Sequence, residues 1–183
     1  MAGLGELSRA PALLALALRL GDTNLGSRGA CALAALGDAP WLQCLDLCLK
    51  YNRLADEDVR VLLALRNMPK LRKLSLNLSG NGLGYGAATA VGLLREAVAL
   101  DTLELNLANN QVGDVGAAAL ASVVAARQLR RLRLDVLHNR IGRSGAAALA
   151  TLHDSPLQRL VLEPASLSCA QSVRHLDFDT EWH

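Results

Sequence analysis

The chain has 183 residues, of which 51% are apolar, 20% charged and 3% aromatic, and its formal net charge is +2. The apolar fraction excludes a disordered chain, no apolar run approaches the ~20 residues that span a bilayer, and the small net charge selects no particular class of partner. Two residue types, 41 leucines and 30 alanines, make up more than a third of the chain. Because so few aromatic residues are available as bulk, this composition predicts a regular architecture in which leucine side chains stack in layers.

Residues 1–12 have room for one partial helix, over residues 3–10, which we expect to act as an N-terminal cap. An apolar segment follows Arg9 and superficially resembles a signal peptide. However, Glu6 precedes it, Arg19 lies close behind it, and it lacks a good cleavage site. We therefore expect the start of this segment to belong to the folded structure.

The sequence then repeats with a period of 29 residues. The opening leucines are Leu13, Leu42, Leu71, Leu100, Leu129 and Leu157. A fixed period of this length is typical of solenoids, in which each unit buries its apolar face only against its neighbours. The predicted units are 13–41, 42–70, 71–99, 100–128, 129–156 and a partial unit at 157–162.

Each unit has two halves with different hydrophobic periods. Residues 103–107, with the sequence LELNL, alternate between apolar and polar, which predicts a half-buried strand. Asn81, Asn110 and Asn139 then share one position, where an asparagine can bond backbone groups of a turn and of the neighbouring unit. A glycine and a helical stretch such as residues 116–124 follow. Small residues in that stretch should let the helix lie close to the strand and let the units stack.

The pattern LxxLxLxLxxNxLGxxGAxALA resembles the leucine-rich repeat family, and most closely its ribonuclease-inhibitor-like class, over residues 13–162. The resemblance implies an α/β solenoid of five to six repeats, with a curved parallel sheet on the concave side and helices on the convex side. In one respect the pattern departs from that class, because two additional residues separate the first leucine from the asparagine. We therefore expect longer or bulged strands.

Residues 163–183 no longer follow the repeat and are predicted to be a C-terminal cap or tail. The segment 175–183, with the sequence HLDFDTEWH, is acidic and aromatic. Through Phe178 and Trp182 it could anchor in a partner, and through its acids it could dock on the arginine-rich end of its own chain, which we slightly favour. Trp41, just before a repeat's opening leucine, is either an exposed contact for a partner or packed between loops.

The alternation also predicts which side chains point outward from the sheet. They are Ala15, Ala17, Arg19, Cys44, Asp46, Cys48, Lys73, Ser75, Asn77, Thr102, Glu104, Asn106, Arg131, Arg133, Asp135, Arg159 and Val161. Cations in this set, chiefly Arg131, Arg133 and Arg159 with Lys73, are candidates for binding an acidic protein, and a merely solvated basic face is the alternative. No aromatic residue is interleaved with them, so nucleic acid is a less favoured partner.

No arrangement of residues supports a cofactor, a metal ion, catalysis or a small-molecule substrate. The segment Gly82-x-Gly84-x-x-Ala87 resembles a dinucleotide fingerprint, but Gly84 is also the recurring turn glycine of the repeat, which explains it better. The four histidines form no cluster with other metal ligands.

The four cysteines are too few for a disulfide framework, and Cys44 and Cys48 would stand about 13 Å apart on one strand, beyond bonding distance. Free thiols point to an intracellular, reducing compartment, with the cytoplasm favoured over an organelle.

These features together predict a non-catalytic protein–protein interaction module. Six strands about 4.8 Å apart span only ~25 Å, which favours an accessory or scaffold subunit of a larger assembly over a free-standing receptor. The alternative is a regulatory leucine-rich repeat protein that inhibits or activates one enzyme or GTPase.

Overall fold

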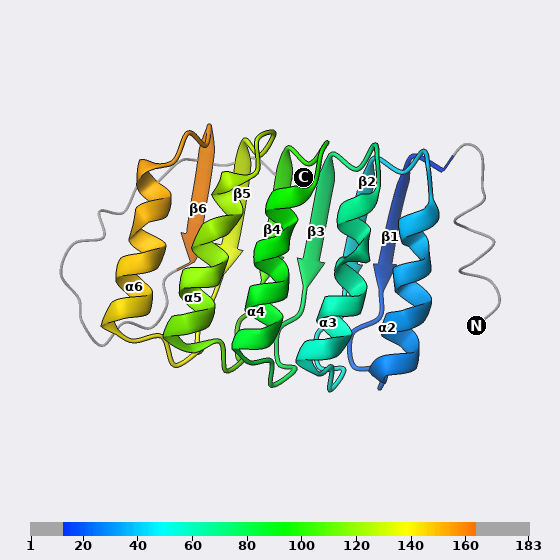
Figure 1. The fold of residues 1–183 in the computed structure, drawn as a ribbon. Helices are drawn as coiled ribbons and strands as arrows, with labels where there is room; N and C mark the ends of the chain where they lie inside the picture. Colours follow the sequence, from blue (N-terminus) through cyan, green and yellow to red (C-terminus); the bar gives the residue numbers. More distant parts are fainter. Residues whose placement is uncertain (1–12, 164–183) are drawn as a thin grey trace.

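The computed structural model describes residues 13–163, and in this range six parallel strands form one sheet that is covered on one face by a row of helices (Figure 1). The strands are β1 (Ala15–Arg19), β2 (Cys44–Cys48), β3 (Lys73–Asn77), β4 (Thr102–Asn106), β5 (Arg131–Asp135) and β6 (Arg159–Glu163). The α-helices are α2 (Gly26–Ala34), α3 (Asp56–Leu62), α4 (Tyr85–Gly92), α5 (Gly113–Ala121) and α6 (Arg143–Ala150). The predicted cap at residues 1–12 and residues 164–183 of the predicted tail lie outside the described range.

Each α-helix runs directly into a short 3₁₀ helix before the chain returns to the sheet. These 3₁₀ helices are Ala35–Asp38, Leu63–Asn67, Leu93–Glu96, Ser122–Ala125 and Thr151–Asp154. The repeated order of strand, α-helix, 3₁₀ helix and strand places every strand beside its neighbour in the sequence. The predicted α/β solenoid is therefore confirmed.

The strands pair in a register set by the repeat length. Leu45 lies opposite Leu74, and Leu74 lies opposite Leu103, so residues 29 positions apart are neighbours across the sheet. Each of the six strands has five residues, and each pairs residue for residue with the next. The expectation of bulged strands is wrong, because every residue of each strand has a partner in register on the next strand.

A single leucine-rich core lies between the sheet and the helices. Leu74 and Leu103, inward residues of β3 and β4, are 0% exposed and lie opposite each other in the sheet. Leu62 and Leu94 close the core from the helical side. Similar side chains therefore form layers, which is why the chain needs few aromatic residues to fill its core.

A column of buried asparagines ties each unit to the one before it. The side-chain oxygen of Asn81 accepts hydrogen bonds from the backbone N–H groups of Asn52 and Leu54, at 2.8 and 3.1 Å. Its amide nitrogen donates to the carbonyls of Leu49 and Leu78, at 3.1 and 2.9 Å. Asn110 repeats this pattern one unit later, with the N–H groups of Asn81 and Leu83 as donors. The predicted bonding between neighbouring units is confirmed.

Asn52 belongs to the same column and was not recognised in the sequence. Its side-chain oxygen accepts from the N–H groups of Thr23 and Leu25, at 3.1 and 2.8 Å, and its amide nitrogen donates to the carbonyl of Leu20 at 2.6 Å. The 29-residue spacing between Asn52 and Asn81 would have been sufficient to find it.

Small residues let neighbouring helices approach one another. A Cβ atom added at Gly116 of α5 would lie 3.0 Å from Ala88 Cβ and 3.3 Å from Tyr85 Cα, both in α4. The nearest atom would be Val112 Cγ1, at 2.6 Å, just before α5. Glycine at this position therefore makes room for a side chain of its own unit and for the neighbouring helix, and the second contact agrees with the expectation that small residues let the units stack.

Two aspartates cap the helix of the following unit. The carboxylate of Asp56, in α3, accepts the N–H of Gly84 at 2.7 Å, just before α4. The carboxylate of Asp114, in α5, accepts the N–H of Gly142 at 2.6 Å and the hydroxyl of Ser144 at 2.5 Å, at the start of α6. An anion at a helix N-terminus satisfies free N–H groups and interacts favourably with the helix dipole. These bonds therefore couple the helical row as the asparagines couple the turns.

The cap at α6 predicts a pH dependence of stability. The bonds from Ser144 and then from the Gly142 backbone lower the pKa of Asp114 below its ordinary value of 3.8. A carboxylate with a lowered pKa in the folded state contributes stability above its unfolded pKa and loses it as the pH falls through the folded value. We expect Asp114→Asn to lower the urea midpoint at pH 7, with a difference from the parent protein that shrinks as the pH falls below 3.8.

Asp154→Asn is the matched control, because Asp154 is exposed and makes no hydrogen bond or ion pair with the described residues. It should leave the midpoint unchanged at pH 7. If the urea midpoint of Asp114→Asn equalled that of the parent protein at every pH, the Asp114 cap would not contribute to stability.

Candidate protein-interaction surface

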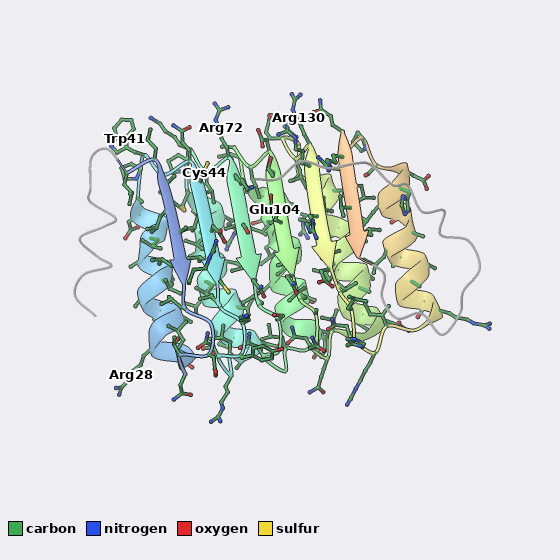
Figure 2. The ribbon with its side chains drawn as sticks, turned by 180° about the vertical axis from the view of Figure 1, so that it is seen from behind. Arg28, Trp41, Cys44, Arg72, Glu104 and Arg130 are labelled. Carbon is green, nitrogen blue, oxygen red and sulfur yellow. The ribbon has the colours of Figure 1, made fainter. Side chains whose placement is uncertain are left out.

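The open face of the sheet, on the side away from the helices, carries the side chains that the sequence predicted to point outward (Figure 2). Register places them in rows across the six strands, so Cys44, Lys73 and Thr102 are consecutive members of one row. Most of these side chains are exposed or half-buried, as predicted. Thr102 is the exception, at 8% exposure.

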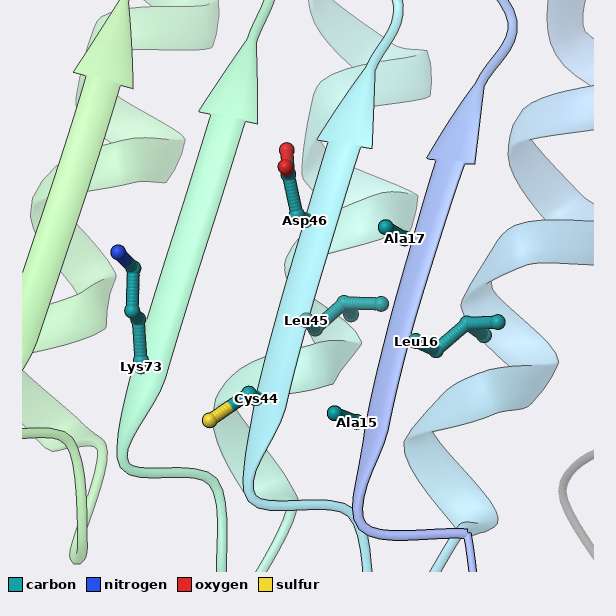
Figure 3. A pocket seen from close by; sticks show the side chains of 7 residues that line it. All are labelled: Ala15, Leu16, Ala17, Cys44, Leu45, Asp46 and Lys73. Carbon is teal, nitrogen blue, oxygen red and sulfur yellow. The ribbon is translucent and has the colours of Figure 1, made fainter. Parts of the chain in front are cut away.

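The N-terminal half of this face is formed by small side chains. Ala15 and Ala17 on β1 lie beside Cys44 and Asp46 on β2, and together with Lys73 they border a shallow, open hollow (Figure 3). Asp46 is bound to Arg19 in an ion pair of 2.7 Å. The hollow is too open to enclose a small molecule, so it is better suited to part of a protein surface.

Three arginines lie on the C-terminal half of the face, together with Asp135 and Val161. Arg131 and Arg133 are two residues apart on β5, and Arg159 lies opposite Arg131 on β6, so their Cα atoms are about 5–7 Å apart. All three are exposed. The sequence therefore identified three cations that the fold brings together at one end of the sheet.

Local acids compensate this charge only in part. The Arg131 guanidinium is 3.9 Å from the Asp101 carboxylate, yet the Arg131 side chain remains 52% exposed. Arg159 makes no ion pair within residues 13–163. An exposed ion pair at 3.9 Å contributes little, so Arg131 can exchange Asp101 for an acid of a binding partner.

Lys73 does not belong to this cluster. Its ammonium group is bound to the Glu104 carboxylate at 2.7 Å, with both side chains about one-third exposed. The pair is neutral as a unit and lies between the arginines and the hollow (Figure 2 labels Glu104). Lys73 was predicted to contribute cationic charge, and the pairing with Glu104 cancels most of it.

Trp41 lies at the edge of the sheet where the strands begin, near Arg72 in the same rim (Figure 2). The Lys70 ammonium sits 3.7 Å from the centre of its ring, and the side chain is 44% exposed. Trp41 is therefore packed by a loop residue of the next unit and is also accessible to a partner. Strands β3 and β4 separate it from the arginines, so the candidate residues occupy two places rather than one.

The remaining two candidates, Phe178 and Trp182, lie outside the described residues. Asp101 and Lys70, which contact two of the candidates, were missed in the sequence. Lys70 could have been found from the repeat, because it follows Trp41 by one period, whereas Asp101 lies 30 residues before Arg131 and is not in register with it.

The glycine-rich segment before α4 allows the Asp56 carboxylate to approach the start of that helix. The Asp56 carboxylate that accepts the Gly84 N–H would also be 2.6 Å from a Cβ atom added at Gly86. The start of α4, where a dinucleotide fold would place a phosphate, thus already faces a carboxylate that would repel it. Within the described residues there is also no group of three metal-ligating side chains.

Comparison with known proteins agrees with the repeat geometry. A family model described as Leucine Rich repeat matches residues 102–121, which cover β4, the following turn and α5. No curated protein matches the chain. None of the helices described between residues 13 and 163 has the length and apolar character to cross a membrane. The strand pairing of the matched unit recurs in register on both sides of residues 102–121, so the similarity to a leucine-rich repeat agrees with the repeated geometry of the neighbouring units.

Proposed function

We propose that this chain is a non-catalytic interaction module whose open sheet face binds an acidic segment of a partner protein. The observation that carries the proposal is the juxtaposition of Arg131 and Arg159 on neighbouring strands, both exposed, one weakly paired and the other unpaired within the described residues. Guanidinium groups in fixed positions recognise carboxylates through paired hydrogen bonds. A rigid sheet supplies such positions better than a loop.

The double variant Arg131→Glu/Arg159→Glu should lose most of this binding. The probe is a synthetic peptide rich in aspartate and glutamate, and its affinity for the full chain is measured by titration at low salt. Since two attractive contacts become repulsive, we expect at least a tenfold weaker affinity, which corresponds to about 1.4 kcal/mol.

The matched control is Arg28→Glu/Arg60→Glu, which changes the net charge equally but on exposed arginines of α2 and α3. It should leave the affinity within about twofold. Equal loss in both double variants would mean that the peptide responds to net charge alone, and the sheet face would then not be its site.

The size of the open sheet face favours one of two roles for the module. The six-stranded face is small, which supports a scaffold or accessory subunit held within a larger assembly. The alternative is a regulator of a single enzyme or GTPase. Purification from native extract separates the two, because a subunit is recovered in a stoichiometric large complex and a regulator as a monomer or with one enzyme.

The subclass and the compartment are part of the same proposal. Helices on one side of a parallel sheet support the ribonuclease-inhibitor-like class. Cys31, Cys44 and Cys48 are free thiols, with the first two exposed, and this supports an intracellular, reducing compartment.

A further inference from the structure

We propose that the acidic segment 175–183 of this chain binds the arginines of β5 and β6, and so competes with an external partner for the same surface. This inference rests on the proposed function, since it assigns an intramolecular ligand to the same site. It is an autoinhibitory contact made by nine of the twenty residues that follow β6 in the sequence.

Charge and spacing support this occupant. Asp177, Asp179 and Glu181 occupy alternate positions, so in an extended segment their carboxylates point to one side and repeat every 6–7 Å. Arg131 and Arg133 repeat at the same interval along β5. An extended segment laid along the strand direction can therefore place successive carboxylates over successive guanidinium groups.

The length of the connection also suffices. Thirteen residues lie between Glu163 and Asp177, and the fully extended connection reaches about 45 Å. The return path from the end of β6 to Arg159 and Arg131 covers only one strand length and one strand spacing, roughly 20 Å. A short tether of this kind gives an effective concentration near the millimolar range, so even weak ion pairs fill the site.

The test uses the full chain with Trp41→Phe, which leaves Trp182 as its one tryptophan. Time-resolved fluorescence anisotropy of Trp182 then reports whether the segment tumbles with the 19.4 kDa protein or moves independently of it. We expect slow, global tumbling in this background at low salt. Adding Arg131→Glu/Arg159→Glu should produce a dominant fast component, whereas adding Arg28→Glu/Arg60→Glu should not.

A second variant reverses the charge of the segment instead of the charge of the arginines. Asp177→Lys/Asp179→Lys/Glu181→Lys alone should release the segment, and combining it with Arg131→Glu/Arg159→Glu should restore slow tumbling. The slow component must also be independent of protein concentration, because concentration dependence would place the contact between two copies and overturn the proposal. Fast motion in every variant would overturn it as well.

Competition separates this inference from the proposed function. If the segment occupies the arginines, Asp177→Asn/Asp179→Asn/Glu181→Gln should strengthen binding of the external acidic peptide severalfold. Unchanged peptide affinity, still sensitive to Arg131→Glu/Arg159→Glu, would reject the intramolecular contact and keep the docking surface. If the peptide bound Arg131→Glu/Arg159→Glu as tightly as the parent protein, both the intramolecular contact and the docking surface would be rejected.

Discussion

Replacing Asn81 by alanine should lower the free energy of unfolding by about 3–5 kcal/mol. The substitution leaves the N–H groups of Asn52 and Leu54 without their acceptor in a site where Asn81 is only 8% exposed. Each buried donor that loses its partner costs about 1–3 kcal/mol, and the carbonyls of Leu49 and Leu78 lose a donor too. Urea denaturation followed by circular dichroism measures the loss.

Asn106→Ala is the matched control. Asn106 lies on the open face of β4 and is half-buried, and its side-chain oxygen accepts a hydrogen bond from the Ala108 N–H at 2.9 Å. Its replacement should cost only about 1 kcal/mol. If both variants were destabilised equally, the buried asparagine column would not be what couples the units.

Replacing Leu103 by alanine should cost about 3–4 kcal/mol. Leu103 is 0% exposed in the middle of β4 and stacks between Leu74 and Leu132 of the neighbouring strands. Truncation removes buried apolar surface and leaves a cavity, because leucines fixed in register on both sides cannot move in to fill the space. The change in urea midpoint at constant slope reports the loss.

Val98→Ala provides the comparison, since Val98 is 69% exposed in the turn between α4 and β4. It should change stability by less than about 0.5 kcal/mol. A loss for Leu103→Ala no larger than that of the control would contradict a close-packed layered core.

The sequence predicts most of this fold because one spacing fixes it repeatedly. Once Leu74, Leu103 and Leu132 are recognised as equivalent, a parallel sheet with those residues in one layer follows directly. The same spacing puts Arg131 and Arg159 on adjacent strands, apart from a shift of one residue in the last unit. Backbone placement was therefore predictable at the level of single residues.

Side-chain partners were harder to predict, because long polar side chains choose among several neighbours. Lys73 lies in register with Thr102 but bonds Glu104, two residues further along β4. Trp41 had two interpretations from the sequence, and only the position of Lys70 shows that its ring is packed and accessible at once. Strand register limits which side chains can reach one another, and the rotamers of these side chains determine which of them make contact.

The open face of the sheet is divided into two halves of different character. Small side chains near Ala15 and Cys44 leave a hollow at one end, and exposed guanidinium groups stand at the other, separated by the neutral pair of Lys73 and Glu104. A partner that extends across the face from β6 to β1 would therefore contact the arginines at one end and the hollow at the other. We expect charge to govern its rate of association.

Site-specific photocrosslinking shows whether a partner binds on the open face of the sheet. A photoreactive benzoylphenylalanine is placed at Ser75, on the open face of β3, or at Thr89, an exposed position of α4, and each full chain is irradiated in native extract. We expect a discrete adduct from Ser75 whose crosslinked peptide is acidic, and we expect it to disappear when Arg131→Glu/Arg159→Glu is added. An equal adduct from Thr89, or one from Ser75 that survives the charge reversal, would show that no partner binds this face through its arginines.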